Sequence, residues 1–97
     1  MAEAIRRQWR QAQYRSRVSP ADLRKLVAAN VRDLAAREGV SLNKLSDLSG
    51  ISRPTMHFLL TARSSVGVDT IAKIADALGK HPSALFAPRD AASKRRR

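Results

Sequence analysis

Residues 52–58 read Ser-Arg-Pro-Thr-Met-His-Phe and bring hydrogen-bonding and aromatic side chains close together in the chain. An arginine guanidinium can bond guanine O6 and N7 at once, which is worth about 1–3 kcal/mol of discrimination between bases. A threonine hydroxyl bonds a base edge or a phosphate, and a phenyl ring can contact the thymine methyl group. These residue types predict a surface that reads base edges of duplex DNA, formed by Arg53, Pro54, Thr55, His57 and Phe58.

Each of these side chains also has a plainer interpretation. Charged residues on exposed helix faces are the norm, so Arg53 also fits a solvated helix start. His57 fits a surface position or a phosphate contact, and Phe58 fits packing against the following loop or a partner chain. Met56 and Leu59 are expected in the core.

A second group of residues is suited to holding phosphates. Backbone amides at the start of a helix donate to phosphate oxygens, and nearby cations strengthen that contact. The basic run at the end of the chain could instead be a solvated tail. The predicted phosphate-binding residues are Ser41, Asn43, Lys44, Ser52, Arg63, Ser64, Lys94, Arg95, Arg96 and Arg97.

The residues from 41 to 60 form two short helices with almost no connection between them. Ser41 is expected to cap the first helix, whose inner face would be Leu42, Leu45 and Leu48, and Gly50 to end it. Ser52 would cap the second helix, at about 53–60, with Ile51 and Met56 as a hydrophobic staple. A turn this tight leaves no room for an antiparallel return, so it predicts a helix-turn-helix.

Three more helices are expected around this pair. A helix at about 20–38 starts after Ser19 and ends before Gly39, with an apolar stripe that includes Leu23, Val27 and Val31. Residues 61–67 are polar and predict a loop. A helix at 68–78 then turns Val68, Ile71, Ile74, Ala75 and Leu78 inward, and a last short helix starts at Pro82. The expected fold is all-α, with five short helices around one core.

The distribution of charge divides the chain into a domain and two arms. Its 97 residues contain 19 basic and 8 acidic side chains, a net charge of +11 that indicates a polyanionic partner. The net charge is +4 over residues 1–19, +3 over 20–88 and +4 over 89–97. The expected organisation is a basic, helical N-terminal arm at 1–19, a domain at 20–88 and a basic, disordered tail at 89–97.

Several function classes are excluded by what the sequence lacks. With no cysteine and two histidines, no metal site is expected, and neither is any other cofactor or a small-molecule ligand. No phosphate-cradling glycine loop or nucleophile-and-base pair indicates an enzyme. No apolar run exceeds four residues, as at 84–87, so no membrane span is expected, and the protein is expected to be cytoplasmic. Because unpaired RNA bases stack on aromatic side chains and the chain has only four of them, RNA is a weaker candidate for the ligand than DNA.

The stretch from 41 to 86 resembles the lambda-repressor-like, Cro and XRE-type helix-turn-helix family. The similarity is carried by Ser41, Leu45, Gly50-Ile51-Ser52 and Val68-Asp69-Thr70-Ile71. It implies a repressor-like bacterial or phage transcription regulator that binds double-stranded DNA, usually as a homodimer on a two-fold symmetric site. Many members have a DNA-contacting Gln where this chain has Leu42, and Glu-x-Gly where it has Leu60-Thr61-Ala62. Base reading therefore depends more on Arg53, methyl contacts and DNA shape.

The N-terminal arm contains a narrow apolar stripe at helical spacing. Ile5 and Trp9 gain most by burial, so they are expected to dock on the domain or to pair with a second copy rather than to enter a DNA groove. These residues, together with Phe58, support an alternative function. In that alternative the chain is an antitoxin-type or partner-binding module whose main role is protein–protein interaction.

Overall fold

The structure, a computed structural model, describes residues 18–89, and every regular element in that range is a helix. The elements are α2 (Pro20–Arg37), α3 (Leu42–Ser49), α4 (Arg53–Leu60), α5 (Val68–Leu78) and η1 (Pro82–Phe86). The all-α prediction is confirmed, but the described range has four α-helices and not the five helices expected. The last element is a 3-10 helix, because it has only five residues and Pro88 keeps the preceding Ala87 in an extended conformation.

The helix boundaries follow the capping residues. Ser19 Oγ accepts from the Asp22 amide at 3.0 Å, and the Asp22 carboxylate accepts from the Ser19 amide at 3.3 Å, which completes a capping box. Ser41 and Ser52 cap α3 and α4 in the same way through their hydroxyls. The first helix ends at Arg37, one residue earlier than expected, and Gly39 adopts the left-handed conformation beyond it.

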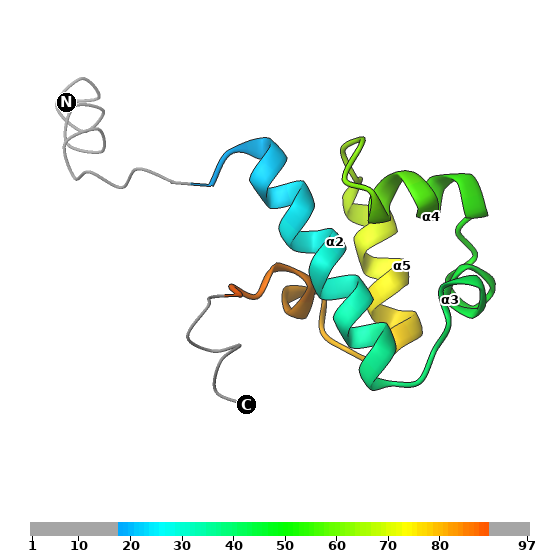
Figure 1. The fold of residues 1–97 in the computed structure, drawn as a ribbon. Helices are drawn as coiled ribbons and strands as arrows, with labels where there is room; N and C mark the ends of the chain where they lie inside the picture. Colours follow the sequence, from blue (N-terminus) through cyan, green and yellow to red (C-terminus); the bar gives the residue numbers. More distant parts are fainter. Residues whose placement is uncertain (1–17, 90–97) are drawn as a thin grey trace, which may run out of the picture.

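The longest helix, α2, crosses the domain and contacts each of the other elements (Figure 1). On one side it packs against η1, drawn in orange, and on the other against α4. The yellow helix α5 lies behind it and also packs against both α3 and η1. As a result α3 and α4 lie together at one side of the domain, where the rest of the fold supports them from behind.

The largest fully buried side chains of the core come from four different elements and are Val31, Leu45, Ile74 and Leu85. Helix α4 adds three buried residues, Met56, Leu59 and Leu60, and the turn before it adds Ile51. Burying an aliphatic side chain of this size contributes about 1.5–3 kcal/mol. The core positions of the two short helices therefore fix both of them to the domain.

Two residues predicted to point inward are on the surface. Leu48 is 52% exposed, because α3 turns the stripe of Leu45, Ser46 and Ser49 toward the core. The two buried serines are small, so a bulky side chain is not needed for α3 to pack closely there. Val68 is 82% exposed, because it is the first residue of α5 and lies beyond the elements that cover Ile71.

A buried polar side chain on the apolar stripe of α2 joins η1 to this helix. The Asn30 amide group donates to the carbonyl oxygens of Leu85 and Ala87, both at 2.9 Å. Its own oxygen accepts from Arg89 Nη1 at 3.1 Å, and Arg89 also forms an ion pair with Asp33 at 3.6 Å. Asn30 thereby holds the short last helix, which has few backbone bonds of its own, against the long first one.

None of the helices between residues 18 and 89 has the length and apolar character to cross a membrane. Over the same range, no three His, Asp or Glu side chains gather closely enough to hold a metal ion.

Candidate nucleic-acid interface

The turn between α3 and α4 is fixed by one glycine and one buried serine. Gly50 has φ 74° and ψ 15°, a left-handed conformation that a residue with a Cβ rarely adopts. Ser49 Oγ donates to the Leu45 carbonyl at 2.7 Å and accepts from the Ile51 amide at 3.4 Å. The chain therefore changes direction within three residues and starts α4 at once.

The outer face of α4 is the one that its sequence predicts. Its inward residues are buried, whereas the predicted base-reading residues are exposed. The His57 and Phe58 rings lie 5.9 Å apart between centroids, tilted by 60°, and the Thr55 hydroxyl accepts from Ser52 Oγ at 2.9 Å. The surface residues of α4 are Arg53, Pro54, Thr55, His57 and Phe58.

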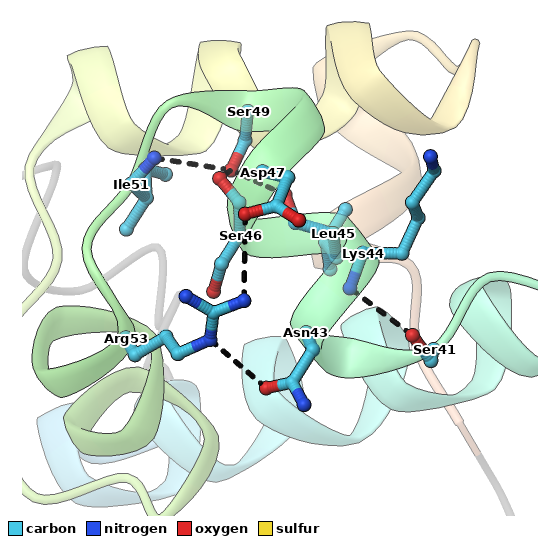
Figure 2. A network of polar contacts seen from close by, with 9 residues as sticks. All are labelled: Ser41, Asn43, Lys44, Leu45, Ser46, Asp47, Ser49, Ile51 and Arg53. Atoms are coloured by element: carbon cyan, nitrogen blue, oxygen red, sulfur yellow. Dashed lines mark hydrogen bonds and ion pairs between the residues drawn. The ribbon is translucent and has the colours of Figure 1, made fainter.

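Arg53 is held by two residues of α3. Its Nε donates to Asn43 Oδ1 at 3.1 Å, and its Nη2 donates to Asp47 Oδ1 at 3.4 Å (Figure 2). The exposed fractions of the Arg53 and Asp47 side chains are 59% and 63%, so this is a surface ion pair. The sequence reasoning missed Asp47, although it is the only acidic residue from 41 to 63.

The other end of α4 is held by two arginines of α2. Arg32 Nη2 donates to the Leu60 carbonyl and Arg24 Nε to the Ala62 carbonyl, each at 3.4 Å. Cations near the last carbonyls of a helix also complement its dipole. The sequence places these arginines on the polar side of the first helix and gives no sign of their partners. They help to set the direction in which α4 lies on the domain.

Ala62, the second residue after α4, has a positive φ of 58°. This conformation favours glycine, since a Cβ there crowds the backbone. The position coincides with the glycine of the Glu-x-Gly pattern from which the sequence departs.

The predicted phosphate-binding residues are only partly brought together. Ser41 and Ser52 use their hydroxyls to accept the amides of Lys44 and Thr55, so each marks the start of a helix. Asn43, in the first turn of α3, uses its oxygen for Arg53 (Figure 2). The further residues Lys94, Arg95, Arg96, Arg97, Ile5 and Trp9 lie outside the described part of the chain.

Some cations of the described domain have an acidic partner, and others, including Lys25 and Lys73 on α2 and α5, have none. Arg37, Lys80 and Arg89 form ion pairs with Asp33 or Glu38 at 3.1–3.6 Å. Lys44, Arg63 and Ser64 are exposed, and among residues 18–89 neither Lys44 nor Arg63 has an acidic partner within ion-pair distance. The surface beside α4 therefore keeps cationic groups free for an anionic ligand.

A model of the Cro/C1-type HTH DNA-binding domain matches residues 30–89 of the chain. An HTH_3 family transcriptional regulator from Vibrio cholerae is 26% identical with a TM-score of 0.66, over 70% of this chain and 38% of that one. A hypothetical transcription factor, NHTF, from Neisseria is 28% identical with a TM-score of 0.69, over 78% of this chain and 87% of that one. The chain thus spans well under half of the Vibrio protein. No curated protein sequence matches it.

Proposed function

Because this chain belongs to the Cro/C1-type helix-turn-helix DNA-binding domain family, we propose that it is a repressor-like transcription regulator that places α4 in the major groove. The observation that carries this proposal is the division of α4 into a buried and an exposed face. Every residue of the helix with base-reading chemistry lies on the exposed face. The core and the two arginines of α2 hold the helix rigidly from behind.

The residues of this surface divide into base-reading and phosphate-binding groups. Arg53 is assigned to guanine, Phe58 to a thymine methyl group, and Thr55 and His57 to base edges or the adjoining phosphates. Pro54 has no amide to donate, so it shapes the start of α4. The amides behind Ser41 and Ser52 are assigned to phosphates, together with Lys44 and Arg63. The sequence-blind part of the affinity then comes from these groups and the basic arms.

The proposal is tested by titrating the full chain with duplexes selected from a random pool, at several salt concentrations. The logarithm of the association constant should fall linearly with the logarithm of salt concentration, with a slope of about −0.9 per phosphate neutralised. Selected sequences that form an inverted repeat about one helical turn apart would identify a homodimer on a two-fold site. Binding that shows neither salt dependence nor sequence preference would overturn the proposal.

Removal of residues 90–97 separates phosphate binding from base reading. The deletion takes away Lys94, Arg95, Arg96 and Arg97, so the salt slope should become shallower by up to about 0.9 for each lost contact. The preferred sequence should not change, because these residues are assigned to the backbone alone. Lys80→Gln serves as a control that removes a cation already paired with Glu38. A changed sequence preference in the deletion would contradict the phosphate-only role.

A groove on the domain offers a docking site for the N-terminal arm. Its volume is about 260 Å³ and it lies where the start of α2 meets the loop before α5 and the last helix. Apolar side chains dominate its lining, and two of them, Leu23 and Phe86, remain exposed at its edge. Because Pro20 itself lines the groove, the N-terminal segment leaves the domain beside it. We propose this segment, with Ile5 and Trp9, as its occupant.

Trp9 is the only tryptophan of the chain, so its fluorescence reports directly on this contact. Its emission maximum should lie to the blue of free tryptophan at every protein concentration, because burial removes the indole from water. Leu23→Ala should shift it to the red, whereas Leu48→Ala, at an exposed apolar site on α3, should not. A blue shift that disappears on dilution would instead assign the groove to a second copy. Emission at the free value in the native protein would rule out docking.

A further inference from the structure

We infer that Asp47 is a specificity-determining residue of this DNA-binding surface. It holds and neutralises Arg53, so that the guanidinium reads a base instead of binding phosphates indiscriminately. The inference rests on the proposed function, in which Arg53 faces the major groove. Asp47 lies on α3 and is not expected to bond DNA itself. It controls what Arg53, the first residue of α4, recognises.

Contacts with α3 occupy one edge of the Arg53 guanidinium and leave the other edge free. Nε and Nη2 form one edge of this planar group, and that edge is occupied by Asn43 and Asp47 (Figure 2). The remaining edge has the donors of Nη1 and the second donor of Nη2, and no residue from 18 to 89 uses them. Two parallel donors at fixed spacing are what guanine O6 and N7 accept. Contacts on one edge thus present the other edge to a ligand.

The contacts with α3 also reduce the conformational entropy of the Arg53 side chain. An arginine side chain has a large rotamer entropy, which a base contact must overcome when the side chain is free. Two hydrogen bonds from one rigid helix restrict Arg53 before DNA arrives. Asn43 and Asp47 are four residues apart, on one face of α3, so they are fixed relative to each other. Most of the side-chain entropy of Arg53 is then already lost in the free protein, before DNA binds.

The Asp47 carboxylate offsets the positive charge of Arg53. Asp47 is the only acidic residue from 41 to 63, and it lies 3.4 Å from a cation that faces the proposed DNA site. A carboxylate at this place lowers the attraction of Arg53 for any phosphate. A phosphate also accepts an arginine fork through two oxygens, but the two contacts with α3 hold the free edge of Arg53 in one direction, in which the proposed site places a base. The pair therefore lowers non-specific affinity more than it lowers affinity for the correct base.

Two substitutions at Asp47 separate the hydrogen bond from the charge. Asp47→Ala removes both, so we expect affinity for random-sequence duplex to rise about two- to fivefold. Preference at the base pair read by Arg53 should fall at least about fivefold, the lower end of what a bidentate contact supplies. Asp47→Asn keeps an oxygen that accepts from Nη2, so it should gain non-specific affinity but retain most of the base preference.

Asp76→Asn is the matched control, because it removes the same charge from an exposed position of α5 with no ion-pair partner in the described range. Affinities are measured on the selected duplex, the same duplex changed at that base pair, and random-sequence duplex. The inference is overturned if Asp47→Ala keeps the full base preference, or if Asp76→Asn raises random-duplex affinity equally. A native protein that does not bind DNA would overturn the proposed function itself, which is a distinguishable result.

Discussion

Leu45→Ala is expected to lower the free energy of unfolding by about 2–5 kcal/mol. Leu45 is fully buried, and it fixes α3 to the core shared with α5 and α2. The substitution loses the transfer free energy of three carbon atoms and leaves a cavity that the neighbouring helices can fill only in part. A domain of this size has a total stability of about 5–15 kcal/mol, so the loss is a large fraction of it.

Leu48→Ala is the matched control on the same helix. Its side chain is 52% exposed, so the identical chemical change should cost less than about 1 kcal/mol. Urea denaturation of both variants measures the difference. The slope of the unfolding free energy against urea concentration should be the same for both variants. Equal losses at the two positions would contradict the assignment of Leu45, and not Leu48, to the inner face of α3.

Arg53→Ala is expected to remove about 1–3 kcal/mol of discrimination at one base pair, which is the value of a bidentate contact to guanine. Affinity for other sequences should fall much less, because Asp47 already offsets the charge of Arg53. The melting temperature should stay nearly unchanged, since Arg53 is exposed and its ion pair with Asp47 is of the surface type.

Arg53→Lys distinguishes the shape of the side chain from its charge. Lysine keeps the positive charge but lacks the planar fork, so the salt dependence should be preserved while the base preference is lost. Competition between the selected duplex and single-base variants measures both quantities. If Arg53→Ala left affinity and site preference unchanged, α4 would not be the reading helix.

The local signals in the chain were sufficient to predict the elements and their ends. Ser19, Ser41 and Ser52 each cap a helix, and Gly39, Gly50 and Gly79 each adopt the left-handed conformation that ends one. These features depend on a few neighbouring residues, so the sequence carries them directly. The exposed face of α4 was predictable for the same reason, because Ile51, Met56 and Leu59 already mark its buried side.

Contacts between distant residues were decided by the tertiary structure alone. Asn30 bonds to the chain 55 and 57 residues later, and Arg24 reaches Ala62 across 38 residues. Helical spacing places Asn30 on the apolar stripe of α2, but nothing in the sequence of α2 identifies the carbonyl groups that Asn30 and Arg24 bond. Leu48 and Val68 fail in the opposite way: helical spacing puts them beside the apolar stripe, but no neighbouring element covers them.

The proposed site likewise has one part that local sequence predicts and one part that depends on tertiary contacts. The residue types at 53–58 predicted base-reading chemistry, because hydrogen-bonding capacity belongs to the side chain itself. The pairing of Arg53 with Asn43 and Asp47 depends on how α3 crosses α4, an angle set by the left-handed Gly50 and by the core behind both helices. Which groups an arginine offers to a ligand is therefore a property of the packed molecule, since its neighbours in space determine which of its donors remain free.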